Sequence, residues 1–148
     1  MPFLQVRDVL RRTSDYHWGI AGYFQTTAGL AGQEPVRLLS QDLSNQHRSQ
    51  SRQLRQFCDK EKPGIADHWI QCDPAYDLER VLKSLKPDSS GDLGDLLATG
   101  VELNRRLIKF YGGLALIAPT EKLREVFANL EKSEMEGQRN LANTGQGI

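Results

Sequence analysis

The sequence predicts an all-α fold in which four long helices form one bundle, with a long crossover connection between the second and the third. Apolar residues recur every three to four positions along four separate segments, as in helices that bury one face. Short links follow the first and third segments, whereas residues 59–91 separate the second from the third. No segment alternates strictly between apolar and polar residues, so we expect no β-sheet. The 148 residues fit one domain, 1–148.

The first predicted helix covers residues 3–31, and the second covers residues 35–58. Their apolar faces comprise Val6, Val9, Leu10, Ile20, Phe24, Leu30, Val36, Leu39, Leu43, Leu54 and Phe57. Gly29 and Gly32 favour a stop and a turn between the helices, and Pro35 suits the first turn of the second because its φ is already helical. A link this short makes the two helices antiparallel.

The segment 59–91 is predicted to be a connection on the outside of the bundle. Its prolines and glycines surround one short helical stretch, residues 76–85. A connection of this length lets the chain cross the bundle, so that the second and third long helices run parallel.

The third and fourth long helices are predicted at residues 92–117 and 120–142, with Pro119 ending the third. Their apolar faces comprise Leu93, Leu97, Val101, Leu107, Ile108, Tyr111, Leu114, Leu123, Phe127, Leu130 and Leu141. The polar residues 143–148 are predicted to form a frayed tail.

The charge balance argues against two classes of partner. Lysine plus arginine and aspartate plus glutamate number 19 each, so the formal net charge is zero. A neutral chain gives no general electrostatic reason for binding nucleic acid or an anionic membrane. The first residues resemble neither a secretory signal nor a membrane span, so we expect a cytoplasmic protein without nucleic acid or membrane partners.

Gly19 and Gly22 lie inside the first predicted helix, and Gly112 and Gly113 lie inside the third. Each costs about 1 kcal/mol of helix propensity relative to alanine. Close approach of another helix would compensate, either within the bundle or across an interface between copies. Together with the zero net charge, these glycines lead us to expect a two-fold homodimer.

The last two helices resemble a known family. The stretch FYGGLALIAPTEKLREVFANLEKSEMEGQRNLA is similar to the corresponding half of rubrerythrins and other ferritin-like proteins, and two short links around one long link are the ferritin-like layout. The close likeness covers about a third of the chain. In that family, a glutamate on the first and third helices and a Glu-x-x-His pair on the second and fourth hold two metal ions.

The resemblance can be carried over one position at a time. On the fourth helix, Glu134 matches the glutamate of Glu-x-x-His, but Gly137 stands at the histidine position. On the third helix the family glutamate usually lies seven residues before a tyrosine, and counting back from Tyr111 gives Asn104. On the first helix the same count gives Tyr16. The resemblance therefore leaves one of these ligands, Glu134.

The second helix allows two registers. The sequence SNQH places Ser44 and His47 at the glutamate and histidine positions, whereas a three-residue slip places His47 and Gln50 there. Neither register supplies a carboxylate.

The predicted interior therefore contains a polar cluster of Tyr16 or His17, His47 with Gln50, Asn104 and Glu134. Two cations about 4 Å apart repel strongly in a helical interior and need several anionic oxygens to offset that repulsion. One glutamate is too few, so we expect no dimetal centre and no cofactor. We expect Glu134 to hydrogen-bond with Tyr16, His47 or Asn104.

The predicted function is non-enzymatic and consists of self-association or of binding a partner or a ligand. A second hypothesis is a metal-dependent oxidoreductase with a single or unusual dimetal site, in which Glu134, His47 and His17 bind iron or manganese. A third is a small-molecule carrier with its pocket beneath the long connection, near Trp69 and Tyr76.

Overall fold

A computed structural model describes residues 3–60, 64–71, 76–87 and 91–146, and the described chain is mostly α-helical. The helices of these residues are α1 (Val6–Leu30), α2 (Glu34–Lys60), α3 (Tyr76–Ser84), α4 (Leu93–Ile117) and α5 (Glu121–Gln146). A short 3-10 turn, η1 (Ile65–Asp67), and two short strands, β1 (Phe3–Gln5) and β2 (Trp69–Gln71), complete the described elements. The predicted all-α class is confirmed. Among the described residues, no helix is both long enough and apolar enough to cross a lipid bilayer.

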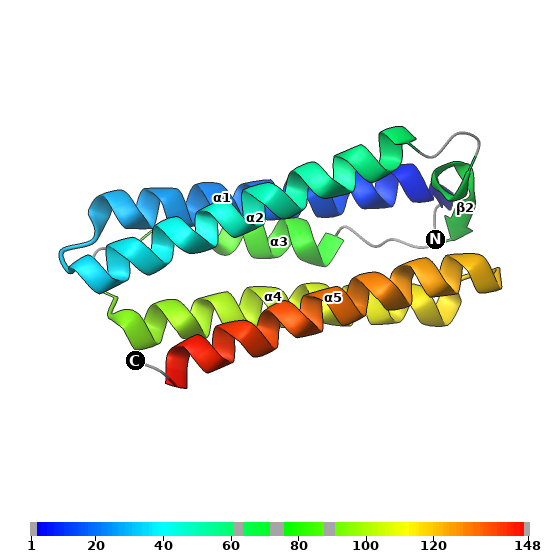
Figure 1. The fold of residues 1–148 in the computed structure, drawn as a ribbon. Coiled ribbons are helices and arrows are strands. Elements are labelled where there is room, and N and C mark those ends of the chain that lie inside the picture. The colour runs from blue at the N-terminus through cyan, green and yellow to red at the C-terminus, as the bar shows by residue number, and fades with distance from the viewer. Residues whose placement is uncertain (1–2, 61–63, 72–75, 88–90, 147–148) are drawn as a thin grey trace.

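The four long helices lie side by side (Figure 1). The colour gradient shows that α1 and α5 run in one direction, while α2 and α4 run in the other. Within this arrangement α1 packs along α2, and α4 packs along α5. The short helix α3 lies on the outside against α1 and α4.

Small polar side chains hold α1 close to α2. Ser14 Oγ lies 2.9 Å from the carbonyl oxygen of Ser51 and 2.8 Å from its hydroxyl. Ser44 Oγ donates to the carbonyl oxygen of Ala21 at 2.8 Å. Because serine is small and these hydroxyls hydrogen-bond to the facing helix, the contacts let the two backbones approach closely.

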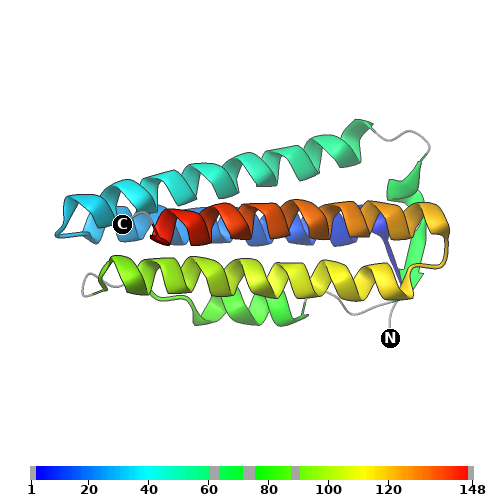
Figure 2. The same cartoon turned by 60° about the horizontal axis from the view of Figure 1, so that its bottom comes forward.

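The four long helices meet tightly at one end of the molecule. A Cβ atom at Gly100 of α4 would lie 3.0 Å from Leu141 of α5, 3.8 Å from Leu43 of α2 and 3.9 Å from Phe24 of α1. The missing side chain is therefore what allows this close packing. Toward the other end α2 rises away from α5 (Figure 2), and this divergence makes room for the site described below.

The expectation of no β-sheet was wrong. β1 and β2 form an antiparallel pair in which Leu4 faces Ile70, and Ile70 is buried. Strands of three residues are too short to show an alternating pattern in the sequence. The first helix consequently begins at Val6, three residues later than predicted, after a capping box between Gln5 and Asp8.

The other predicted boundaries differ little from the observed ones, with one exception. The predicted frayed tail is helical as far as Gln146, because α5 continues past residue 142. Residues 147 and 148 lie outside the described residues. At the start of α4, a capping box between Asp92 and Asp95 fixes the first turn.

Candidate functional site

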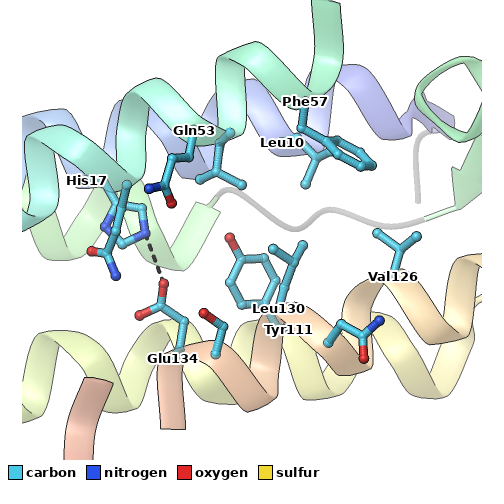
Figure 3. Close-up of a pocket in the computed structure, with 12 residues that line it drawn as sticks. Leu10, His17, Gln53, Phe57, Tyr111, Val126, Leu130 and Glu134 are labelled. Carbon is cyan, nitrogen blue, oxygen red and sulfur yellow. Dashed lines mark ion pairs between the residues drawn. The ribbon is translucent and has the colours of Figure 1, made fainter. Parts of the chain in front are cut away.

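A cleft of about 360 Å³ opens between α2 and α5 in the half of the molecule where these helices diverge (Figure 3). Its lining residues are Leu10, His17, Gln50, Gln53, Leu54, Phe57, Tyr111, Val126, Asn129, Leu130, Ser133 and Glu134. One end is apolar, where Phe57 of α2 faces Val126 and Leu130 of α5 (Figure 3). Leu54 of α2 is a further apolar residue of the lining. The other end is polar and contains the one carboxylate of the lining, Glu134.

Glu134 is buried because it continues the inward face of α5. Leu123 and Phe127 are fully buried, and Glu134 follows Phe127 by seven residues, close to two helical turns. Leu141 lies seven residues further on and is also buried. The carboxylate is 7% exposed and reaches the floor of the cleft.

The partner of Glu134 is His17 of α1, and not Tyr16, His47 or Asn104 as we expected. His17 Nε2 lies 3.2 Å from Glu134 Oε1 (Figure 3). The distance is that of an ion pair, but the direction is off the line of the ring N–H, so it does not complete a hydrogen bond. Both side chains line the cleft, and His17 Nε2 is buried without a hydrogen-bond partner among the described residues.

His17 contacts His47 of α2 through its other ring nitrogen. The two Nδ1 atoms lie 2.9 Å apart, and both rings are buried. Burial, followed by the neighbouring His17, lowers the pKa of His47 to about 3, so its ring is neutral near pH 7. The three side chains form a chain in the order His47, His17, Glu134, which links α2 to α5 through α1.

Tyr111 of α4 also lines the floor of the cleft, and its hydroxyl points into the space between the helices (Figure 3). Burial raises its pKa above the ordinary value, so the hydroxyl keeps its proton. The neighbouring Thr13 hydroxyl partly offsets this rise in the pKa of Tyr111. The Thr13 hydroxyl itself donates to the carbonyl oxygen of Leu10 at 2.9 Å. In the described part of the chain, no atom completes a hydrogen bond with Tyr111 Oη.

The predicted polar cluster is assembled only in part. Tyr16 is fully buried but donates to the backbone carbonyl oxygen of Leu103 at 2.9 Å, so it joins α1 to α4 and not to Glu134. Gln50 is half-buried at the wall of the cleft. Asn104 is half-buried, and among the described residues no hydrogen bond joins it to this cluster. The inward line of α4 runs instead through Leu103, Leu107 and Tyr111, one residue away from Asn104 in register.

The geometry disfavours a common metal ion for the three candidate ligands. His17 faces His47 with Nδ1 and Glu134 with Nε2, and these nitrogens lie on different sides of the ring. The three donors therefore do not converge on one point, which a metal ion requires. Within the described ranges, no group of three or more His, Cys, Asp or Glu side chains is placed to hold a metal.

The pocket expected beneath the long connection, near Trp69 and Tyr76, is found only in part. Trp69 is 59% exposed, and the side chain of Tyr76 lies outside the described residues. A hollow of about 350 Å³ lies between α3 and α4, and its lining includes Val81, Leu85, Glu102 and Arg106. The cleft between α2 and α5 has nearly the same volume, about 360 Å³, but it contains the buried polar side chains His17, Tyr111 and Glu134.

The sequence contained a signal for His17 and Tyr111 but none for the cleft. His17 precedes Ile20 by three residues and Phe24 by seven, which is the spacing of one helical face. Tyr111 lies on the apolar stripe of its helix and was interpreted as core. The cleft depends on the divergence of α2 and α5, which the sequence pattern does not express.

Comparison with known proteins gives no match, whether to a family model, to a curated protein or to a solved structure. The functional argument therefore depends on the geometry of the cleft and of the residues that line it.

Proposed function

We propose that this chain is a non-enzymatic ligand-binding protein of the ferritin-like class that takes a small organic molecule into the cleft between α2 and α5. The observation that carries the proposal is the cleft itself. Its volume of about 360 Å³ falls in the range of small-molecule sites, roughly 300–1,000 Å³. Such sites combine apolar walls with a few placed polar groups, as this lining does.

Two unpaired polar atoms support a ligand at this position. His17 Nε2 and Tyr111 Oη are both buried, and neither has a hydrogen-bond partner in the described part of the chain. Leaving such a group unpaired costs about 1–3 kcal/mol. A bound molecule that offers hydrogen bonds at the cleft floor would recover this energy.

The proposed ferritin-like arrangement draws on the helix directions and the packing in pairs described above. The long segment between α2 and α4 would be its crossover connection. In this class the dimetal centre would lie between the four helices, where this chain has Glu134 as the carboxylate of its cluster. We propose that the centre has been lost and that ligand binding has taken its place.

The competing hypothesis is a metal-dependent oxidoreductase that binds iron or manganese through Glu134, His47 and His17. The short distance between His17 and Glu134 is its main support, and the divergent directions of the donors count against it. Elemental analysis of protein purified without chelator separates the two. Stoichiometric iron or manganese would favour the enzyme.

Self-association as a two-fold homodimer remains part of the proposal. Large apolar side chains are exposed at the turn between α1 and α2, where Leu30 is 47% and Leu38 is 52% exposed. Gly22 of α1 faces open space, so a second helix could approach it. Light scattering at tens of micromolar protein tests this, and a monomer would contradict it.

Ligand binding is tested with the neutral apolar fluorophore N-phenyl-1-naphthylamine. We expect a saturable rise in fluorescence that corresponds to a single site per chain. Leu130→Trp fills the cleft and should abolish the signal, whereas Leu38→Trp places the same side chain on an exposed face of α2 and should not. No saturable binding, or equal binding by both variants, would contradict a ligand site in the cleft.

A further inference from the structure

The charges that line the cleft are unbalanced. Among the described lining residues, Glu134 is the one carboxylate, and neither lysine nor arginine is present. His17 is the one imidazole of the lining, and its neighbour His47 is neutral near pH 7 because burial lowers its pKa to about 3. A carboxylate on the floor of an apolar cleft favours a ligand that brings the opposite charge.

The contact between the two histidines decides which groups His17 offers to the cleft. Because the Nδ1 atoms lie 2.9 Å apart, one ring must donate and the other accept. When His17 donates from Nδ1, its neutral ring leaves Nε2 as an acceptor. An ammonium group between Nε2 and Glu134 Oε1 would stabilise this tautomer, because it can donate to both atoms.

With His17 in this tautomer, the polar end of the cleft presents three hydrogen-bond acceptors. They are the Glu134 carboxylate, His17 Nε2 and Tyr111 Oη, whose lone pairs are unused. They come from α5, α1 and α4, and all three side chains line the same cleft (Figure 3). A primary ammonium group has three N–H donors and a positive charge, and it matches this set.

We propose that the cleft binds a primary organic amine, with its ammonium group on Glu134, His17 and Tyr111 and its apolar body between α2 and α5. The inference rests on the proposed ligand-binding function and names the chemical class of the ligand. The body lies among the apolar lining residues, which include Leu54, Phe57 and Leu130. An aliphatic or aromatic chain of modest length suits a volume of about 360 Å³.

The test compares three probes that differ only in the head group, namely hexylamine, hexanol and hexanoate. Each probe is titrated near pH 7 into wild-type protein that holds N-phenyl-1-naphthylamine, and its affinity is measured from the displacement of the fluorophore. We expect hexylamine to bind at least about tenfold more tightly than hexanol, because a charge-assisted hydrogen bond replaces a neutral one. Hexanoate should bind most weakly, since its carboxylate would face Glu134.

Two variants assign the preference to the polar end. Glu134→Gln should lower the affinity for hexylamine by about tenfold or more and change that for hexanol by less than about threefold. Glu131→Gln, which removes a carboxylate of α5 outside the cleft lining, is the matched control and should change neither. Tyr111→Phe should lower hexylamine affinity by about three- to tenfold, and it keeps the test decisive if Glu134→Gln does not fold.

The outcomes separate this inference from the proposed function. If the fluorophore binds but hexanol or hexanoate binds as tightly as hexylamine, the amine assignment is wrong and ligand binding in the cleft stands. The assignment is also overturned if a folded Glu134→Gln or Tyr111→Phe keeps the full preference for hexylamine. If neither the fluorophore nor any of the three probes binds, both proposals fail.

Discussion

The Nδ1 atoms of His17 and His47 lie 2.9 Å apart in the protein interior, although the two residues belong to different helices. Since each neutral imidazole carries one proton, the pair is satisfied only when one ring donates and the other accepts. A second proton on His47 would remove this complementarity when His17 is the donor. The pair therefore couples the packing of α1 against α2 to pH.

Acidification should destabilise the protein through His47. Its pKa is about 3 in the folded protein and about 6.5 in an unfolded chain, so the unfolded state binds more protons between these values. The contribution of His47 is therefore complete above about pH 6.5 and is lost as the pH falls toward 3. Urea unfolding should show a loss of about 2 kcal/mol between about pH 7 and about pH 5 from this group.

A pair of variants isolates the effect of His47. His17 and Glu134 belong to the same chain of contacts as His47. The dependence of wild-type stability on pH therefore does not by itself assign the effect to His47. His47→Gln should flatten the curve between about pH 5 and 7. His68→Gln, at an exposed histidine, should leave the curve as it is in the wild type. An unchanged slope in His47→Gln would show that other groups carry the effect.

Tyr16→Phe should weaken the association of α1 with α4. The Tyr16 hydroxyl donates to the Leu103 carbonyl oxygen at 2.9 Å, and its loss should cost about 0.5–1.5 kcal/mol of unfolding free energy. Tyr23→Phe, at a half-buried tyrosine of the same helix, should change stability by less than about 0.5 kcal/mol. Equal effects of the two substitutions in urea unfolding would contradict the role assigned to this bond.

Glu134→Gln tests the structural role of the carboxylate and its competing role as a metal ligand. The variant keeps the shape of the side chain and should fold, with unfolding free energy changed by at most about 1–2 kcal/mol. We expect no change in metal content on elemental analysis. A stoichiometric metal in the wild type that disappears in the variant would overturn the ligand-binding proposal in favour of a metal site.

Two glycines of α1 should respond differently to alanine. Within one chain a Cβ at Gly22 meets nothing within 4 Å, so at concentrations where the protein is a monomer Gly22→Ala should stabilise it by up to about 1 kcal/mol through helix propensity. A Cβ at Gly19 would lie 2.9 Å from Leu82 Cδ2 of α3, so Gly19→Ala should give a smaller gain or a loss.

The contact with Leu82 can be removed as a control. In a Leu82→Ala background, Gly19→Ala should recover most of the gain in stability seen for Gly22→Ala, because the new methyl group at position 19 no longer meets a long side chain at position 82. Thermal or urea unfolding of the wild type, of Gly19→Ala, of Leu82→Ala and of the double variant gives the coupling free energy between positions 19 and 82. If Gly19→Ala and Gly22→Ala are equally stabilising in the wild-type background, the packing of α3 on Gly19 is not the constraint that the structure indicates.

The sequence determined the positions of the helices because each one carries its own periodic apolar pattern. Val6, Val9 and Ile20 identify the buried face of α1 without reference to any other segment. The same reasoning placed Leu123, Phe127 and Glu134 on one face of α5, and these residues are buried together. Local spacing is sufficient for such predictions, since 3.6 residues per turn set which side chains share a face.

Only the tertiary structure decided which side chain meets Glu134 and where the cleft opens. The partner is His17, because the rotation of α1 relative to α5 brings Nε2 to within 3.2 Å of the carboxylate. The cleft opens because Gly100 lets the helices converge at one end while α2 and α5 diverge at the other. A periodic pattern states which face turns inward, whereas the rotation and separation of helices arise from packing between side chains that are distant in the sequence.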